Sequence, residues 1–220
     1  MSERPLSDDE VRQMAALGRG PDGRSTDIAS GGGVPRWLAA MTRFCSRCGS
    51  ALALATPPDE NRERLACPSC GYITYVNPRM VVTTIPVNDA GEVVLIRRGI
   101  APGYGSWAQP GGFLEIDETV SEAAIRETLE ETGLLVEPGE LVGIYSRLEA
   151  AVVTLVFEAR VVGGEARTSA ESLEVVPFRA DAIPWSEIAF KTSWWGIHDW
   201  VARRHPEVAL PSSFLGREML

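Results

Sequence analysis

Three carboxylates stand at helical spacing in the middle of the chain. Glu127, Glu130 and Glu131 occupy positions i, i+3 and i+4, so on a helix they project from one face. Carboxylates crowded in this way repel one another unless water solvates them, a proton is shared or a cation neutralises them. Oxygen ligands at this density suit Mg²⁺ or Mn²⁺, which bind carboxylates together with water and substrate phosphates. The segment therefore indicates either a divalent-metal site for phosphate chemistry or a solvated acidic face.

The residues around these carboxylates favour the metal site. Gly111 and Gly112 follow Pro110 and let the backbone approach a ligand closely. Arg126 lies four residues before Glu130, where it can orient a carboxylate and limit the repulsion. A glycine turn, a cation and several carboxylates are the parts that a metal-phosphate site needs.

A helix must position these groups. Thr119 is a candidate N-cap, good helix formers fill the interior, and Gly133 is a stop signal. Ile125 and Leu129 point roughly away from the carboxylates. We therefore expect the Ile125 side to pack against the protein and the carboxylate side to face the ligand.

The order of glycines and charges over residues 112–134 resembles the signature box of the Nudix hydrolases. The matching positions, in chain order, are Gly112, Glu118, Arg126, Glu127, Glu130, Glu131, Gly133 and Leu134. One position departs, because the family usually has an aliphatic residue where this chain has Thr128. Threonine is β-branched and can still pack there, so the ligand set is unaffected.

The resemblance implies roles for the box residues. Glu127 and Glu131 would be the principal ligands of Mg²⁺ or Mn²⁺, with Glu130 and the Gly111 carbonyl as further candidates. Arg126 would orient the carboxylates. The residues expected to contact the substrate are Gly111, Gly112 and Glu118.

Two glutamates outside the box, Glu171 and Glu174, are candidates for completing the metal shell or activating water. Related enzymes place the general base either in the box or on a later loop, and residues 171–174 have the character of such a loop. A solvated loop glutamate is the ordinary alternative for each.

All four cysteines of the chain lie in two Cys-x-x-Cys-Gly motifs. Cys45 and Cys48 form the first, Cys67 and Cys70 form the second, and eighteen residues separate them. This is the spacing of a tetrahedral zinc ribbon. Two disulfides or a redox pair are the alternatives, but we find no secretory signal, and thioredoxin-like chemistry uses one such motif on a βαβ unit. Because four thiolates leave no open coordination position, we expect a structural Zn²⁺.

The composition argues against two kinds of partner. Among 220 residues, 30 are acidic and 21 basic, and the net charge of −9 disfavours nonspecific binding to a nucleic-acid backbone. No apolar run approaches the ~20 residues needed to cross a membrane. We therefore expect no nucleic-acid partner, no membrane partner and a cytoplasmic location.

The remaining sequence indicates a linker, a small ribbon and an α/β domain. Residues 1–36 are rich in Gly, Ser, Asp and Arg, and a capping-box pattern at Ser7 predicts a short helix through Leu17. Strands are expected at 80–87, 93–97, 141–147, 152–162 and 175–179, with a hairpin turn at 88–91 and a closing helix at 191–204. Strands on both sides of the carboxylate helix predict an α/β layered domain.

The Nudix resemblance makes this fold more specific. It implies an α/β/α sandwich around a mixed sheet, preceded by the small zinc ribbon. We divide the chain into a flexible extension, the ribbon, the Nudix domain and a C-terminal tail. Their expected ranges are 1–40, 41–77, 78–205 and 206–220.

The sequence around the box resembles the zinc-ribbon Nudix hydrolases related to ADP-ribose and FAD pyrophosphatases. The resemblance spans about residues 44–204 and includes 75–80, 171–174 and 183–185. It implies that the substrate is a dinucleotide, ADP-ribose or FAD, from which water releases AMP and a second phosphomonoester. NADH pyrophosphatases share the ribbon and the box but carry a Ser-Gln-Pro-Trp-Pro-Phe-Pro type motif, which this chain lacks. NADH is therefore the second candidate.

An adenine or flavin ring needs an aromatic or apolar platform. The candidates are Tyr145, Phe178, Trp185 and Tyr75, and core packing is the alternative for each. The resemblance also leads us to expect a homodimer. A hypothesis of a different class is a noncatalytic nucleotide sensor whose ribbon contacts nucleic acid, but sensors of this type tend to lose box carboxylates that this chain retains.

Overall fold

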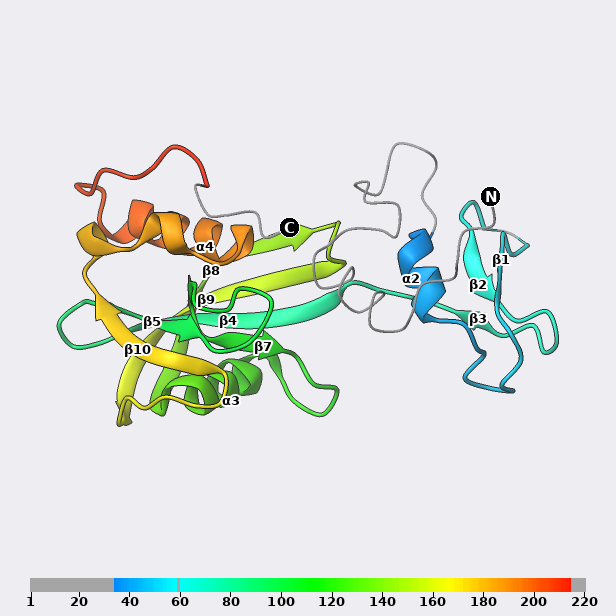
Figure 1. Cartoon of the computed structure of the whole chain (residues 1–220), viewed down its shortest axis with the longest axis horizontal. Helices are drawn as coiled ribbons and strands as arrows, with labels where there is room; N and C mark the ends of the chain where they lie inside the picture. The colour runs from blue at the N-terminus through cyan, green and yellow to red at the C-terminus, as the bar shows by residue number, and fades with distance from the viewer. Residues whose placement is uncertain (1–33, 59, 215–220) are drawn as a thin grey trace. The chain divides into compact units, whose positions relative to one another are not determined.

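The computed structural model describes residues 34–58 and 60–214, which divide into two compact units (Figure 1). The smaller unit ends at Pro78 and includes the turn Leu148–Ala151. The larger unit comprises Arg79–Arg147 and the chain from Val152 onward. The helix expected from Ser7 to Leu17 lies outside the described residues.

The smaller unit is an antiparallel ribbon preceded by a short helix. Helix α2 (Arg36–Met41) begins within the range in which we expected a flexible extension. The three strands pair in chain order and are β1 (Ala53–Ala55), β2 (Arg64–Ala66) and β3 (Ile73–Thr74). Gly49 and Gly71, which each follow a cysteine motif, have φ of 74° and 72°, a left-handed conformation that glycine adopts without strain. Each motif can therefore turn back on itself.

The larger unit is built on a mixed seven-stranded sheet. Its strands are β4 (Arg79–Val87), β5 (Val93–Arg98), β6 (Trp107–Ala108), β7 (Gly111–Phe113), β8 (Leu134–Arg147), β9 (Val152–Gly164) and β10 (Ser172–Phe178). The order is β10-β5-β4-β9-β8, with β6 paired to β5 and β7 paired to β4. The β4–β9 pair is parallel and the other described pairs of this sheet are antiparallel.

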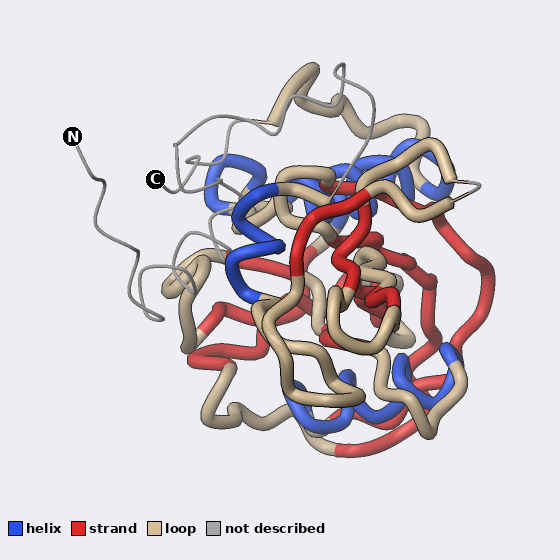
Figure 2. Tube along the Cα trace, turned by 90° about the vertical axis from the view of Figure 1, so that its right-hand side faces the viewer, coloured by secondary structure: helices blue, strands red, loops and turns tan. Residues whose placement is uncertain are grey.

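Helices cover both faces of this sheet (Figures 1 and 2). Helix α3 (Val120–Thr132) lies on one face and helix α4 (Lys191–Arg204) lies on the other. The single-turn 3-10 helices η1 (Ala180–Ala182) and η2 (Trp185–Glu187) connect β10 to α4. The expected α/β/α sandwich with a mixed sheet is confirmed. None of the described helices is long and apolar enough to cross a membrane.

The two faces have different cores. The α4 face is lined by large buried side chains such as Ile85, Ile197 and Trp200. The α3 face has a small cluster in which Ala123 and Ala124 of the helix pack against Val82 of β4. Because alanine side chains are short, α3 can lie close to the sheet, which brings its carboxylates to the glycine turn at β7.

Most of the expected elements are present. The hairpin turn is confirmed by the pairing of Val87 with Val93, and Gly91 has φ of 75°. Strand β8 begins at Leu134 rather than at Leu141, because it is an edge strand that tolerates Pro138 and has irregular register from there to Leu141. The turn-forming sequence there had suggested a loop.

The expected packing side of the carboxylate helix is wrong. Ile125 is exposed and Leu129 is only partly buried. The buried residues of α3 are Ala123, Ala124, Thr128, Glu131 and Thr132. The helix thus packs through its small residues and turns part of its carboxylate side towards the sheet, so the carboxylates have unequal surroundings.

Candidate active site

The carboxylate helix is fixed at both ends by local interactions. Thr119 is its N-cap, and the Thr119 side chain and Glu122 form a reciprocal capping box. Gly133 ends the helix with φ of 75°, and its N–H donates to the Leu129 carbonyl. The predicted cap and stop are therefore confirmed.

The three box carboxylates have three different environments. Glu131 is buried with 5% of its surface exposed, and its Oε2 accepts a hydrogen bond from the Gly111 N–H at 2.8 Å. Glu127 is largely buried, whereas most of the Glu130 side chain is exposed. Glu131 and Glu127 are desolvated enough for burial to change their protonation.

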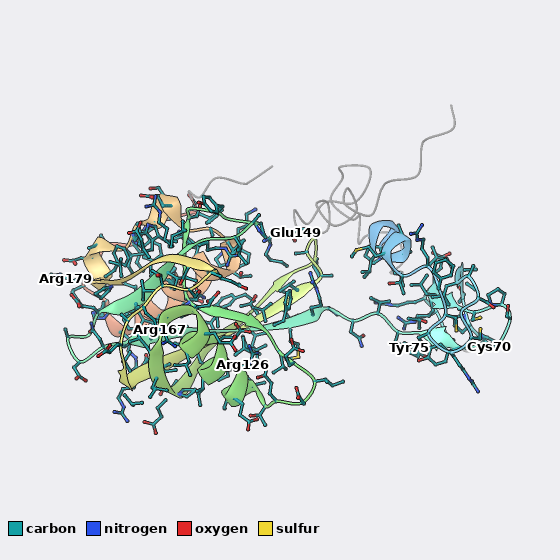
Figure 3. All side chains as sticks on the ribbon, turned by 60° about the horizontal axis from the view of Figure 1, so that its bottom comes forward. Cys70, Tyr75, Arg126, Glu149, Arg167 and Arg179 are labelled. Atoms are coloured by element: carbon teal, nitrogen blue, oxygen red, sulfur yellow. The ribbon has the colours of Figure 1, made fainter. Side chains whose placement is uncertain are left out.

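Arg126, a residue of α3 that is labelled in Figure 3, forms ion pairs with three box acids. Its guanidinium donates to both carboxylate oxygens of Glu118, at 2.8 and 2.6 Å, and to Glu127 at 2.7 Å. A longer contact of 3.3 Å joins it to Glu130. The hydrogen bonds from Arg126 lower the pKa of Glu118 to about 2. Glu118 therefore anchors Arg126, which in turn orients Glu127.

The two glycines of the turn are required by close contacts. Gly111 has φ of 150°, and a Cβ added there would lie 2.3 Å from the Val82 carbonyl oxygen. A Cβ at Gly112 would lie 2.4 Å from a carboxylate oxygen of Glu127. Both distances are below any real carbon contact, so larger residues would displace β4 or the carboxylate.

Burial perturbs the ionisation of the two inner glutamates. It raises the pKa of Glu131 to about 7, although the Gly111 hydrogen bond and the charge of Arg98 act in the opposite direction. Burial also raises the pKa of Glu127 against the effect of Arg126. The charge of Glu171 raises the pKa of both. These perturbations mark Glu127, Glu131 and Glu171 as one electrostatic group.

The structure separates the two loop glutamates. The charge of Glu171 raises the pKa of the box carboxylates Glu127 and Glu131. Glu174 instead accepts a hydrogen bond from Arg97 at 2.7 Å, and both side chains are exposed. Arg97 and Arg98 are neighbours on β5 and point to opposite faces. Because Arg98 interacts with Glu131 and Glu171, Glu174 lies on the side away from them.

Glu127, Glu131 and Glu171, here called the acidic group, offer the type of ligand that Mg²⁺ or Mn²⁺ prefers, but their carboxylates do not converge on one position. The donors are carboxylate oxygens, which these hard cations prefer. Within the described residues, however, the four cysteines are the one group of three or more His, Cys, Asp or Glu side chains that lie close enough together to hold an ion. Glu127 is held by Arg126 and Glu131 by Gly111. A cation would have to draw these carboxylates together.

Thr128, the departure from the box pattern, has a specific partner. Its side chain is fully buried, and its Oγ1 donates to the Ala124 carbonyl at 2.7 Å. The Oγ1 atoms of Thr84 and Thr128 share a hydrogen bond of 2.6 Å between β4 and α3. A polar contact thus replaces the aliphatic one, and the hydroxyls of Thr84 and Thr128 are both paired.

The candidate ring platforms do not gather at the acidic group. The Tyr145 hydroxyl donates to Asp199 of α4 at 2.8 Å, and its ring stacks with Trp195, so it lies on the sheet face opposite α3. Phe178 and Trp185 pack against the α4-side core. Tyr75 is exposed in the ribbon, where its hydroxyl donates to Glu60.

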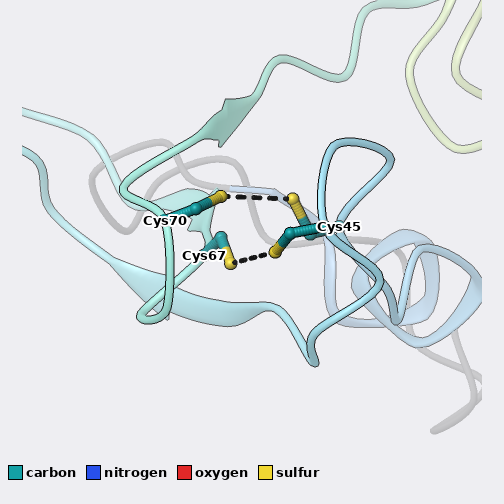
Figure 4. A group of neighbouring side chains, drawn as sticks. Cys45, Cys67 and Cys70 are labelled. Carbon is teal, nitrogen blue, oxygen red and sulfur yellow. Dashed lines mark hydrogen bonds between the residues drawn. The ribbon is translucent and has the colours of Figure 1, made fainter.

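The four cysteines form a compact cluster in the ribbon (Figure 4). All four Sγ atoms lie within 4.8 Å of one another, with Cys45–Cys70 at 3.8 Å and Cys48–Cys67 at 3.5 Å. Four Zn–S bonds of about 2.3 Å place tetrahedral sulfurs ~3.8 Å apart. None of the four is in a disulfide. Without an ion the cluster shares its protons unevenly, because hydrogen bonds from Ser50 lower the pKa of Cys48 whereas contacts with the other cysteines raise the pKa of Cys70.

Sequence reasoning missed two residues at the acidic group, Arg98 and Ser172. Arg98 interacts with Glu131 and Glu171, and its Nε donates to the Pro102 carbonyl at 2.9 Å. Ser172 is buried, and its hydroxyl donates to the Glu131 carbonyl at 2.6 Å. Arg98 is one of two adjacent arginines and Ser172 is a small residue in a stretch that we expected to be a loop, so neither had a local signal.

Comparison with known families agrees with this architecture. The NUDIX domain model matches residues 77–202, and the Nudix N-terminal zinc-ribbon model matches residues 43–76. The first match alone covers more than half of the chain. The chain therefore belongs to the NUDIX domain family.

The names of individual relatives mention different substrates. An ADP-ribose pyrophosphatase from Methanocaldococcus jannaschii is 37% identical over 51% of this chain and 69% of its own length. The NAD-capped RNA hydrolase NudC from Pseudomonas aeruginosa is 30% identical over 66% of this chain and 51% of its own length. A crystal structure of a NUDIX hydrolase from Nitrosomonas europaea has 37% identity and a TM-score of 0.71, and covers 79% of this chain and 97% of that chain. A MutT-like protein from Streptomyces ambofaciens is 43% identical over 43% of this chain, which spans 59% of that relative.

Proposed function

We propose that this protein hydrolyses the diphosphate linkage of a nucleoside diphosphate derivative, either ADP-ribose or FAD, and releases AMP and a second phosphomonoester. The observation that carries the proposal is the environment of Glu131. This glutamate is buried, has a pKa raised to about 7 and lies beside Glu127 and Glu171 at a glycine turn. Buried acids with perturbed pKa values are characteristic of reaction centres rather than of solvated helix faces.

Glu127, Glu131 and Glu171 would hold Mg²⁺ or Mn²⁺, with Glu130 and the Gly111 carbonyl as further ligands. When bound, such an ion neutralises diphosphate charge and lowers the pKa of a water molecule. Arg126 keeps Glu127 in place because it is itself held by both oxygens of Glu118. We choose Glu171 over Glu174 as the loop glutamate that completes the metal shell, with activation of water as the alternative role, since Glu171 interacts with the box acids and Glu174 is paired with Arg97.

The substrate assignment rests on sequence on both sides of the box. The similarity to an ADP-ribose pyrophosphatase supports ADP-ribose, and the missing Ser-Gln-Pro-Trp-Pro-Phe-Pro type motif supports the same ranking against NADH. The similarity to a protein named NAD-capped RNA hydrolase NudC, together with the match of this chain to the Nudix N-terminal zinc-ribbon model, keeps NADH as the second candidate.

A panel of ADP-ribose, FAD and NADH with Mg²⁺ or Mn²⁺, assayed for released AMP, tests the proposal. We expect the highest kcat/KM with ADP-ribose or FAD. The test variant is Glu131→Gln, which should lose most of its activity, and the matched control is Glu137→Gln on the exposed side of β8, which should be unchanged. A preference for NADH would reverse the ranking, and turnover without a divalent cation would contradict the proposed site.

Three further expectations belong to this proposal. We propose that Cys45, Cys48, Cys67 and Cys70 bind a structural Zn²⁺, that the chain forms a homodimer, and that it acts in the cytoplasm without a nucleic-acid partner. Zinc content by mass spectrometry and oligomeric state by analytical ultracentrifugation test the first two. Salt-sensitive DNA or RNA binding without Mg²⁺-dependent turnover would instead favour the nucleotide-sensor hypothesis.

A further inference from the structure

Ser172 joins the start of β10 to the end of the carboxylate helix. Its side chain has 1% of its surface exposed, and its hydroxyl donates to the Glu131 carbonyl at 2.6 Å. Glu131 lies in the last turn of α3, where carbonyl groups lack partners within the helix. The contact therefore satisfies an otherwise unpaired acceptor and fixes β10 against the residue at the centre of the acidic group.

The same hydroxyl organises the turn that carries Glu171. Ser172 Oγ accepts a hydrogen bond from the Ser169 N–H at 2.9 Å and lies 3.1 Å from the Ser169 hydroxyl. The Ser169 hydroxyl in turn accepts from the Glu171 N–H at 3.1 Å. The backbone of Glu171 is thus positioned by a chain of hydrogen bonds that begins at Ser172.

A β-bulge gives Ser172 its direction. Ser172 pairs with Arg98 and Glu174 pairs with Arg97, so Leu173 is an extra residue in the register. In a regular strand, Ser172 and Glu174 would point to the same face. The bulge instead turns Ser172 towards α3 while Glu174 meets Arg97 on the other side.

The Glu171 turn is also held from its other side. The Gly99 N–H donates to the Glu171 carbonyl at 2.7 Å. A Cβ at Gly99, the residue after β5, would lie 3.2 Å from both the Ala170 carbonyl oxygen and the Glu171 carbonyl carbon, so the Glu171 turn has little space for movement on this side. Arg167, which lies beside α3 (Figure 3), donates its N–H to the Thr132 carbonyl at 2.8 Å. The whole segment is anchored to α3 and β5.

We propose that Ser172 is a positioning residue that holds the Glu171 carboxylate beside Glu127 and Glu131, so that the loop acid and the box acids act as one metal-binding group. This inference rests on the proposed hydrolase function and on the role of Glu171 in it. Its physical basis is that one buried hydroxyl contacts both parts, the Glu131 carbonyl directly and the Glu171 turn through Ser169.

A double-mutant cycle between Ser172 and Glu171 tests the proposal. Ser172→Ala should lower kcat by about 10- to 100-fold, since small displacements of a catalytic group have effects of this size. Glu171→Gln should lower kcat at least as much. The double variant should be no slower than Glu171→Gln alone, because Ser172 acts through that carboxylate. Multiplicative losses would overturn the proposal.

Two other variants separate positioning from general destabilisation. Ser172→Cys keeps a weak donor and should recover part of the lost kcat. Gly99→Ala pushes on the same turn from β5 and should also have no further effect in the Glu171→Gln background. If Ser172→Ala fails to fold, as judged by circular dichroism, these two variants carry the test.

A binding measurement provides a readout that does not depend on turnover. Titration of Mn²⁺, followed by electron paramagnetic resonance of the free ion, should show weaker binding in Ser172→Ala and in Glu171→Gln. Unchanged Mn²⁺ affinity and kcat in a folded Ser172→Ala variant would refute the inference, and so would an active Glu171→Gln variant. The proposed function would fail separately, if Glu131→Gln kept full activity.

Discussion

The ribbon and the box are the two expected metal sites of this chain, and they differ in how complete they are without an ion. In the ribbon, the four Sγ atoms already lie within 4.8 Å of one another at the spacing of a zinc tetrahedron. In the box, Arg126 holds Glu127, the Gly111 N–H holds Glu131, and Glu171 stands on a separate turn. The sulfur atoms of the ribbon are thus already arranged for an ion, whereas the carboxylates of the box would have to move together to bind one.

This difference matches two uses of a metal. Four thiolates fill a tetrahedral ion and leave no position for water or substrate, so the ion can serve only the fold. To bind a cation, Glu127 and Glu131 would have to give up part of their hydrogen bonding to Arg126 and to the Gly111 N–H. Mg²⁺ bound in this way would keep coordination positions for water and phosphate oxygens. The following predictions test whether the two sites divide their roles in this way.

Removing a ribbon ligand should have the largest effect on folding. Cys67→Ser should abolish zinc binding and unfold the ribbon, because structural Zn²⁺ supplies about 10–16 kcal/mol of apparent binding free energy in zinc-finger peptides. The larger unit should stay folded, since it has its own core. Zinc content and two-dimensional amide NMR measure both outcomes, with Ser69→Ala as the control. Complete loss of turnover in a variant whose larger unit is folded would contradict a purely structural role of the ribbon.

Removing an inner box carboxylate should affect chemistry rather than folding. Glu127→Gln and Glu131→Gln should each lower kcat by about 100- to 10,000-fold, the range for loss of a group used in proton transfer or charge stabilisation. Glu130→Gln should lose less, because most of that side chain is exposed. Steady-state kinetics with saturating Mg²⁺ measure the difference. Equal losses at all three positions would show that burial does not rank the ligands.

The buried Glu131 should make the larger unit less stable as the pH rises when no divalent cation is bound. Its pKa is raised from 4.5 to about 7, so the folded state binds more protons than the unfolded state between these values. Stability should therefore be highest below about pH 4.5 for this group and fall by about 3 kcal/mol as the pH passes through 7.

Urea unfolding of zinc-loaded protein without Mg²⁺, at pH 5 and pH 8, measures most of this change, because the loss begins near the unfolded pKa of 4.5 and levels off above 7. Glu131→Gln should reduce the pH dependence and raise stability at pH 8, while Mg²⁺ should stabilise the natural chain but not the variant. An unchanged pH dependence in Glu131→Gln would mean that another group titrates.

The smallest expected effect is at Tyr145, which lies on the sheet face opposite α3. Tyr145→Phe removes the hydrogen bond to Asp199 and should cost about 1 kcal/mol of stability. Because the residue is held by α4, we expect KM for ADP-ribose to stay the same. Thermal unfolding and kinetics test the two statements, and a large rise in KM would restore Tyr145 as a substrate platform.

Local sequence carried much of the fold and the outline of both sites. The cap at Thr119 and the stop at Gly133 define α3, since both act through contacts within a few residues. The cysteine spacing predicts the ribbon cluster for the same reason. The expected strand at 80–87 is present as β4, where a β-branched run forms a strand whose central residues are buried one after another.

The amino-acid sequence alone therefore defines the kind of chemistry through its residue types, their spacing along one helix and two cysteine motifs, and the family that shares them. Which carboxylates are buried depends on the packing of the helix, because α3 packs through Ala123, Ala124 and Thr128 rather than through Ile125. The tertiary structure also brings Glu171, Ser172 and Arg98 to Glu131 across many residues of chain. Burial and long-range contacts depend on how the helix meets the sheet, and no local pattern encodes that.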